Sequence, residues 1–190
     1  NTQKLLSMKL NKIKHIKHLR LKHNRGYGFG ILTGIKRAKT DFVGWTHADL
    51  QTDPLDLLKA VSMINKFGDN IFIKGKRKGR PFFDTLFTIG MSIFESIIFK
   101  KILWDINAQP TILHKSLVTK MINAPDDFLL DLYTYVLAKK NHIPFKRIEV
   151  NFKNRLYGKS KWNINYRSKI KFILRTIKYS IELKRSYFKI

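Results

Sequence analysis

The stretch from Asp41 to Pro54 reads DFVGWTHADLQTDP and joins an apolar run to a polar end. The apolar run from Asp41 to Trp45 predicts a buried strand. Asp53-Pro54 predicts a helix start, because an acid caps a helix and proline suits the first helical position. In an extended segment, residues two apart point the same way, so we expect one shared face for three polar side chains: His47, Asp49 and Gln51.

These three side chains are possible metal ligands. An imidazole, a carboxylate and a side-chain carbonyl can hold a divalent ion such as Mn2+ or Mg2+, whose open positions then take phosphate oxygens. That is chemistry for a nucleotide diphosphate. On spacing alone, an ordinary strand end followed by a helix cap remains the alternative.

The segments that follow predict an α/β fold. Leu57, Val61 and Ile64 would give the helix after Pro54 a buried face, and Gly68 would end it. The segment Asn70–Lys74 predicts the next strand. The candidate metal face would then lie between a strand and a helix, at the strand's carboxyl end, where open α/β sheets place their ligands.

Two segments after these strands are rich in cations. The stretch from Gly75 to Arg80 reads GKRKGR and predicts a glycine-flanked loop, in which arginine can bind two phosphate oxygens at once. A solvated surface loop is the alternative. The segment Arg147–Phe152 predicts a later strand, and the loop after it combines three cations and a hydroxyl in a phosphate clamp: Arg155, Lys159, Ser160 and Lys161.

Upstream, the segment Thr2–Lys22 has apolar residues near helical spacing and predicts a basic helix. The glycines at 26, 28 and 30 precede another helical pattern, Ile31–Lys39. A dinucleotide-binding loop needs a strand before its glycines and an acidic residue about 20 positions later. The preceding segment is basic, so we interpret the glycines as a tight turn into a helix.

Two downstream segments could lie on a membrane surface or pack on the domain. The segment Phe82–Leu103 is apolar but contains four charged residues, which makes it a poor membrane span and leaves an interfacial helix or a buried helix. Between it and the later strand, Asp105–Gln109 predicts a polar loop, and Asp126 or Asp127 predicts a helix start. A basic amphipathic helix is expected over Ile164–Lys184, with one apolar side: Ile170, Ile173, Leu174, Ile177 and Ile181.

Composition limits the functional classes. The chain has 190 residues, of which 44% are hydrophobic, so it suits one domain with a real core. It has no cysteine, which excludes disulfides, thiolate metal sites and cysteine nucleophiles and fits a reducing cytosol. The formal charge of +25 predicts polyanionic partners. Nucleic acid is disfavoured, because no helix-turn-helix, zinc-finger or aromatic RNA-binding pattern is present.

From Asn24 to Trp162 the order of motifs resembles family 2 glycosyltransferases of the GT-A fold. The resemblance is strongest to the branch of dolichyl-phosphate mannosyltransferase and bacterial polyprenyl-phosphate glycosyltransferases. The residues that carry it are Asn24–Gly28, Gly34, Ala38, Asp41–Gln51, Gly75–Arg77, Arg80, Asp105–Pro110, Asp127-Phe128 and Arg155–Lys161.

This resemblance implies a Rossmann-like mixed sheet flanked by helices, with a catalytic domain over 1–162 and a membrane-surface helix over 163–190. It implies inverting, metal-dependent transfer of a sugar from a nucleotide diphosphate to a polyprenyl phosphate. The enzyme would be cytoplasmic and peripheral, on the anionic inner face of a membrane of the cell envelope.

The resemblance also implies roles for single residues. Asp49 and Asp105 would lie near the metal and the donor sugar, while Arg77 and Arg80 would contact the donor phosphates. Asn107 and Gln109 would bind sugar hydroxyls. Asp127 would act as a base if the acceptor were a saccharide.

The chain departs from the family pattern in two ways. His47 stands where the family usually has the first aspartate of Asp-Ala-Asp-Leu-Gln, so the site has less negative charge for a metal. The family's opening strand and its Val-Asp-Asp-Gly-Ser segment, which bind the nucleotide base and ribose, have no counterpart here. We therefore expect a truncated enzyme, with a saccharide-acceptor enzyme, an inactive relative or a polyanion-binding protein as alternatives.

Overall fold

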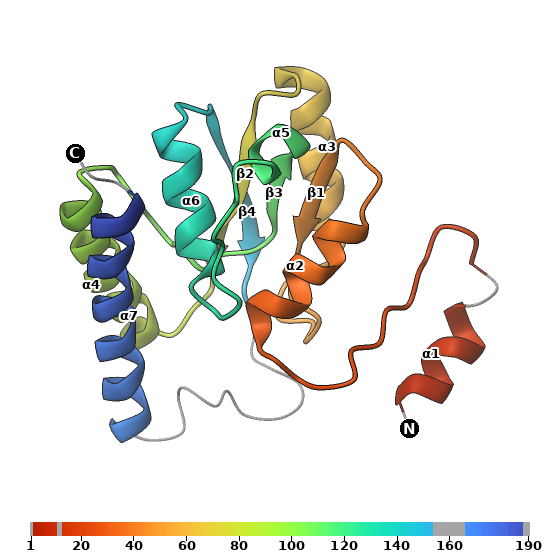
Figure 1. Ribbon diagram of the computed structural model, residues 1–190, viewed down its shortest axis with the longest axis horizontal. Helices are drawn as coiled ribbons and strands as arrows, with labels where there is room; N and C mark the ends of the chain where they lie inside the picture. The colour runs from red at the N-terminus through yellow and green to blue at the C-terminus, as the bar shows by residue number, and fades with distance from the viewer. Residues whose placement is uncertain (1, 11–12, 154–165, 188–190) are drawn as a thin grey trace.

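The computed structural model, which describes residues 2–10, 13–153 and 166–187, has a four-stranded sheet with helices on both faces (Figure 1). The strands are β1 (Phe42–Trp45), β2 (Phe72–Lys78), β3 (Thr111–His114) and β4 (Phe145–Asn151). The helices are α1 (Thr2–Leu10), α2 (Tyr27–Arg37), α3 (Asp56–Phe67), α4 (Phe82–Phe99), α5 (Lys115–Val118), α6 (Leu130–Lys140) and α7 (Tyr166–Tyr187). The expected α/β fold with a mixed sheet is confirmed.

The sheet has the order β1-β3-β2-β4, in which β3 runs antiparallel to both neighbours and β4 runs parallel to β2. Strand β2 is longer than the sequence predicts. The loop expected over Gly75–Arg80 is wrong from Gly75 to Lys78, because β2 continues to Lys78, which pairs with Asn151 of β4. The turn comes at Gly79, whose φ of 77° suits a glycine.

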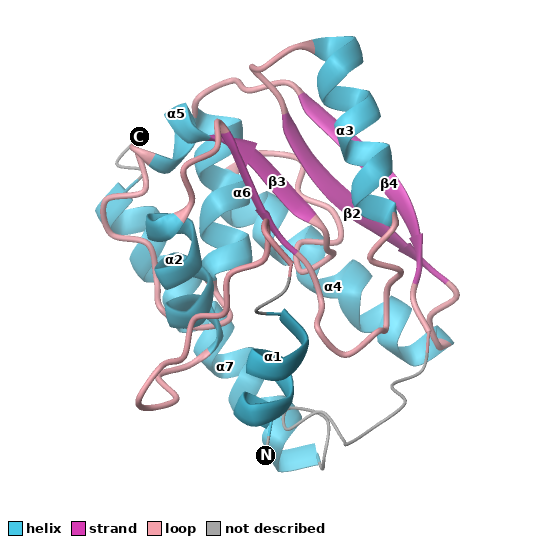
Figure 2. Ribbon diagram, turned by 90° about the vertical axis from the view of Figure 1, so that its right-hand side faces the viewer, coloured by secondary structure: helices cyan, strands magenta, loops and turns pink. Residues whose placement is uncertain are grey.

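Each face of the sheet has its own apolar core. On one face, α3 covers Ile73 of β2 and the preceding Ile71, together with Ile112, Ile148 and Val150 (Figure 2). On the other face, Phe72 and Leu113 pack against α6. Helix α6 is buried from Leu130 to Ala138, as expected of a helix enclosed on all sides.

The predicted tight turn into α2 is confirmed at Gly26, which has a φ of 109°. Helix α2 begins at Tyr27, four residues before the predicted helix, so Gly28 and Gly30 lie inside it and not in the turn.

Helix α3 begins and ends near its predicted positions, and Gly68 ends it with a φ of 78°. The predicted buried face of α3 is confirmed at Leu57 and Ile64, which pack against the core, and is wrong at Val61, which is 52% exposed.

The predicted helix from Thr2 to Lys22 is wrong in its second half. Helix α1 ends at Leu10, and residues 16–26 are irregular. Ile13, Ile16 and Leu19 are exposed, so no tertiary packing stabilises a helix there. Helix α1 itself lies apart from the sheet (Figure 1).

Helices α4 and α7 form an outer layer beyond α6 (Figure 1). Helix α4 is long and apolar enough to cross a membrane, by length and composition, with a mean hydropathy of 1.5 and 17% of its residues buried. Two of the four charged residues in the predicted segment lie outside the helix, because α4 ends at Phe99, before Lys100 and Lys101. Its exposed side is apolar and includes Phe82, Phe83, Leu86, Ile93 and Ile97.

The helix expected near the carboxyl end is present as α7, and it packs on the domain through residues outside the predicted apolar side. Thr176, Ser180 and Leu183 are buried against the domain. An apolar stripe therefore stays exposed: Ile170, Leu174 and Ile181. The predicted domain boundary at 162–163 lies outside the described residues.

One buried polar contact joins the two outer helices. The hydroxyl of Ser180 on α7 donates to Oε1 of Glu95 on α4 across 2.7 Å. Glu95 is 1% exposed, and its Oε2 has no hydrogen-bond partner among the described residues. Burial raises the pKa of Glu95 to about 7, because a buried carboxylate loses its hydration.

Glu95→Gln should stabilise the protein increasingly as pH rises. The folded pKa lies above the ordinary value, so wild type loses stability between pH 4.5 and about 7, by up to about 3 kcal/mol. Urea unfolding at several pH values measures this, with Glu182→Gln at an exposed position of α7 as the control. A difference between Glu95→Gln and wild type that stays constant over this range would contradict the assignment.

Candidate functional site

The segment after β1 turns instead of staying extended. Residues 48–52 bend, Leu50 has a φ of 59°, and Oδ1 of Asp49 accepts the N–H of Gln51 across 3.2 Å. The predicted shared face of the three polar side chains is therefore wrong. An aspartate that bonds the backbone two residues on favours a turn over an extended strand.

The same turn is tied to the end of β4. The N–H of Lys153 donates to the carbonyl of Gln51 across 2.8 Å. In return, the side-chain amide of Gln51 donates to the carbonyl of Lys153 across 3.2 Å. These bonds fix the segment after β1 beside Lys153, just beyond the end of β4.

Phe152 is the centre of this region. The His47 ring meets it edge-on, with 5.8 Å between ring centroids. The guanidinium carbons of Arg77 and Arg80 lie 5.4 Å and 5.7 Å from its ring centroid, within cation–π range. The structure thus brings together one predicted metal ligand and both predicted phosphate-binding arginines, at the carboxyl ends of β1, β2 and β4.

Arg77 is held by a buried carboxylate. Asp105 accepts the backbone N–H of Arg77 across 2.8 Å, its Nε across 2.8 Å, and a second guanidinium nitrogen. Burial pushes the pKa of Asp105 up, but the charge and hydrogen bonds of Arg77 outweigh it and hold that pKa below its usual range. The pair therefore places a fixed, oriented cation at the edge of the site.

Arg80 keeps an open donor. One terminal nitrogen of its guanidinium donates to the hydroxyl of Thr88 on α4. Its Nε is buried and has no hydrogen-bond partner among the described residues. A buried donor without a partner is costly, so a ligand oxygen would be favoured there.

A cavity of about 50 Å³ extends from Arg77 between α4, α6 and α7. Asn107, the predicted sugar contact, also lines this cavity. The remaining walls are mostly apolar, with Met91 and Phe172 among them, and include the Glu95 carboxyl. The cavity suits a group that is mainly apolar.

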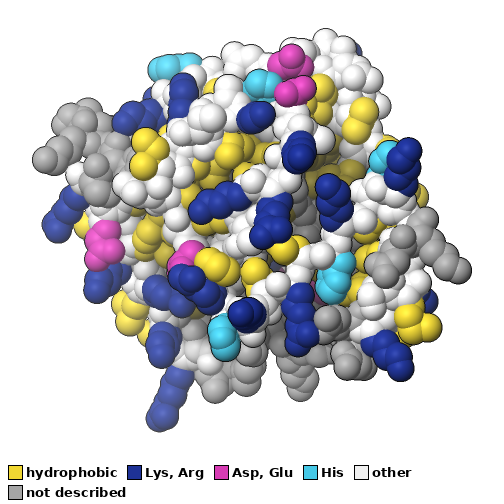
Figure 3. Space-filling model, turned by 45° about the vertical axis from the view of Figure 1, so that its right-hand side comes forward, with side chains coloured by type: hydrophobic (Ala, Val, Ile, Leu, Met, Phe, Trp, Pro, Cys, Tyr) yellow, Lys and Arg dark blue, Asp and Glu magenta, His cyan; other side chains and the backbone are white. Residues whose placement is uncertain are grey.

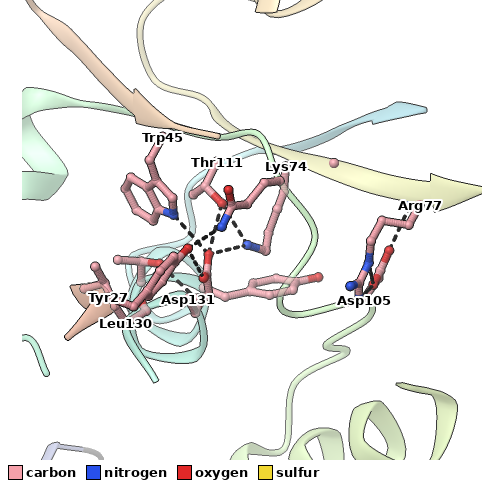
Figure 4. Close-up of polar contacts among 12 residues, drawn as sticks. Tyr27, Trp45, Lys74, Arg77, Asp105, Thr111, Leu130 and Asp131 are labelled. Atoms are coloured by element: carbon pink, nitrogen blue, oxygen red, sulfur yellow. Dashed lines mark hydrogen bonds and ion pairs between the residues drawn. The ribbon is translucent and has the colours of Figure 1, made fainter. Parts of the chain in front are cut away.

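Beneath the site lies a buried polar cluster centred on Asp131 of α6 (Figure 4). Oδ1 accepts from Lys74 Nζ at 3.1 Å, Thr111 Oγ1 at 3.2 Å and Trp45 Nε1 at 3.3 Å. Oδ2 accepts the Tyr27 hydroxyl across 2.8 Å. These donors come from α2 and from β1, β2 and β3.

The electrostatics of the cluster follow from its burial. Complete burial lowers the pKa of Lys74, and the charge of Asp131 offsets only part of that effect. Burial, followed by the negative charge of Asp131, raises the pKa of Tyr27. Asp131 is the ion-pair partner of this ammonium, and the negative charge of Asp105 adds to its stabilisation.

Two other predicted residues, Gln109 and Asp127, make contacts elsewhere in the structure. Gln109 is 2% exposed, and its amide nitrogen donates to the Tyr27 hydroxyl, so it belongs to the Asp131 cluster. Oδ1 of Asp127 accepts the N–H of Leu129 across 2.9 Å in the turn before α6. The predicted phosphate clamp lies outside the described residues: Arg155, Lys159, Ser160 and Lys161.

The side chains at the strand ends can be compared with the ligands that a divalent metal ion needs. Among the described residues, no group of three or more His, Asp or Glu side chains is placed to hold an ion. His47 and Asp49, with the amide oxygen of Gln51, are what the segment after β1 offers. Mg2+ and Mn2+ take few protein ligands when phosphates supply the rest, so these residues fit an ion shared with a diphosphate.

Sequence reasoning missed three central residues. Lys74 interrupts the apolar run of β2, and Asp131 interrupts the apolar pattern of α6, which are signals of a buried pair. Phe152 ends a strand and looks like an ordinary core residue. No local pattern distinguishes it.

A four-stranded mixed sheet flanked by helices is consistent with a partial GT-A fold, which is Rossmann-like. The model of glycosyl transferase family 2 matches residues 1–112. This chain therefore belongs to glycosyl transferase family 2. No curated protein sequence matches it.

Asp131→Asn should destabilise the protein by about 3–5 kcal/mol, because Lys74 is left as an uncompensated buried charge. Lys74→Met should cost less, since three donors still satisfy Asp131. Urea unfolding measures both, with Asp126→Asn at an exposed pair with Arg25 as the control. Equal effects of the Asp131 and Asp126 changes would contradict this account.

Proposed function

We propose that the protein transfers a sugar, with inversion, from a nucleotide diphosphate to a polyprenyl phosphate. The proposal extends the glycosyltransferase family assignment. The observation that supports it most is the group of His47, Arg77 and Arg80 around Phe152. Cations and a possible metal ligand at one set of strand ends suit a diphosphate.

In this proposal the donor diphosphate lies between the segment after β1 and the end of β2. His47, Asp49 and Gln51 would hold a divalent ion, which would supply positive charge to the diphosphate oxygens. Arg77 and Arg80 would bind the diphosphate and stabilise the negative charge that develops on it as the sugar leaves. Asn107 would contact the sugar at the mouth of the cavity.

The acceptor phosphate needs no strong base in this reaction. Its second pKa is near 6, so it is largely ionised at pH 7 and its oxygen can attack the sugar carbon directly. Three described acids near the site accept hydrogen bonds: Asp105 from Arg77, Asp131 from four donors, and Glu95 in the cavity from Ser180. Such a site suits an acceptor that arrives already deprotonated.

The surface supports a location on an anionic membrane. Lysines and arginines outnumber acids across the face in Figure 3. The exposed side of α4 carries Phe83 and Ile97, at 80% and 70% exposed, and Lys100 and Lys101 follow its end. The opposite side of α4 is hydrogen-bonded to the domain through Ser92, Glu95 and Ser96. Helix α4 would thus lie in the interface with one face in lipid.

Asp49→Asn should lower kcat/KM for transfer to polyprenyl phosphate by about a hundredfold or more, because it removes the ion's carboxylate ligand. Asparagine keeps the oxygen that accepts the N–H of Gln51, so the turn is preserved. The assay uses the intact protein with labelled nucleotide sugars, and Asp69→Asn at an exposed position is the control.

Two outcomes would count against the proposal. Unchanged turnover in Asp49→Asn would remove the metal assignment. Transfer to a saccharide without any lipid phosphate would replace the proposed acceptor.

Phe83→Ser combined with Ile97→Ser should weaken binding to vesicles that contain an anionic phospholipid by about tenfold or more, since two apolar side chains would leave lipid for water. Flotation of protein with vesicles measures this. The control is Leu55→Ser combined with Leu58→Ser, because these residues at the start of α3 are also exposed, at 67% and 62%, but lie elsewhere. Equal losses in both double variants would contradict a docking face on α4.

A further inference from the structure

The turn from Leu103 to Asp105 adopts an unfavourable backbone conformation. Asp105 has a φ of 44°, in the left-handed region that non-glycine residues rarely occupy. Such a conformation persists only where neighbouring groups hold it, and it is concentrated at functional sites. The groups that hold this turn therefore bear on the Asp105–Arg77 pair.

Helix α4 holds the turn from one side. The hydroxyl oxygen of Ser96 accepts the N–H of Leu103 across 2.9 Å. One helical turn earlier, Oγ of Ser92 accepts the N–H of Asp105 across 3.2 Å. Ser92 is 1% exposed, so the contact is shielded from water.

Arg147 of β4 holds the turn from the other side. Its guanidinium donates to the carbonyl of Gly75 across 2.5 Å and to the carbonyl of Trp104. It also donates to the Tyr135 hydroxyl across 3.1 Å. The same hydroxyl accepts the N–H of Trp104 across 3.4 Å, so Trp104 is held at both its N–H and its carbonyl.

These contacts join the two backbones that carry the ion pair. Trp104 directly precedes Asp105, and Gly75 lies two residues before Arg77 on β2. One planar guanidinium therefore fixes the spacing between the segments that present the carboxylate and the cation. Gly75 also lies close to Gln109. A Cβ at Gly75 would be 2.3 Å from the Gln109 carbonyl oxygen, so this position requires a glycine.

The β2–β4 pairing does not need the Arg147 side chain. The strands pair through backbone bonds over seven residue pairs, from Phe72 opposite Phe145 to Lys78 opposite Asn151. The guanidinium instead donates hydrogen bonds to a carbonyl of β2 and a carbonyl of the turn before β3. Its contacts serve the position of that turn.

We propose that Arg147 is a positioning residue for diphosphate binding: it holds Gly75 and Trp104 so that Asp105 aims the guanidinium of Arg77 into the site. This role rests on the proposed function for its ligand. The orientation of Arg77 can be measured without any ligand, as the pair in Figure 4 is formed within the chain.

The test follows the side-chain Nε–H of Arg77 by nitrogen–proton NMR of the intact protein, with the signal assigned by its loss in Arg77→Lys. In Arg147→Met, this proton should exchange with water about tenfold faster or more, because Asp105 no longer holds it. Calorimetric affinity for UDP and GDP with Mn2+ should fall by about tenfold in the same variant.

Lys146→Met is the matched control, since this neighbouring lysine lies over the Phe67 ring on the opposite face of the sheet. Tyr135→Phe keeps the ring and removes only the hydroxyl contacts, so it gives a milder form of the same test. Faster exchange of the Arg77 proton is expected in both Arg147→Met and Tyr135→Phe.

The outcomes separate the positioning role of Arg147 from the proposed function. An Arg77 proton that exchanges at the wild-type rate in Arg147→Met, or equally fast in Lys146→Met, would overturn the positioning role. If the proton responds as expected but wild type binds neither nucleotide, the proposed function fails, and Arg147 orients Arg77 for some other ligand. If nucleotide affinity falls equally in Arg147→Met and Lys146→Met, the effect is one of basic charge and the positioning role is overturned.

Discussion

The carboxylate of Asp131 is the interaction on which the domain depends. It is buried, it compensates the ammonium of Lys74, and it gathers donors from α2, β1, β2 and β3 onto α6. Apolar packing does not fix such a register, because it is non-directional. A buried carboxylate with several directional hydrogen bonds does, and so the strand ends that carry His47 and Arg77 are held in one arrangement.

Above this cluster the site is built from strand ends and the segments that follow them. Phe152 brings the segment after β1 and the end of β2 together, and Asp105 orients Arg77. Helix α4 contributes to both sides of the proposed reaction. One face bonds the turn that carries Asp105, and the other exposes apolar side chains. A lipid-docked α4 would therefore be in direct contact with the turn that sets the ion pair.

Sequence reasoning succeeded where the signal is local. The strand ending at Trp45, the helix that Gly68 ends and the turn at Gly26 follow from residue preferences within a few positions. It failed where a distant segment decides. The length of β2 depends on β4, and the segment after β1 is held by hydrogen bonds to Lys153, just beyond β4. Asp131 and Lys74 were visible as charges in apolar runs, but their pairing was not.

The central claim is that a nucleotide diphosphate and its divalent ion bind at the strand ends around Phe152. Mn2+ broadens the NMR signals of nearby nuclei, so titrating Mn2+ with UDP or GDP into the labelled protein locates the ion. The account predicts that broadening is strongest for residues 46–53, 77–80 and 152–153 and weak across α3. Broadening centred elsewhere, or the same broadening with and without nucleotide, would contradict it.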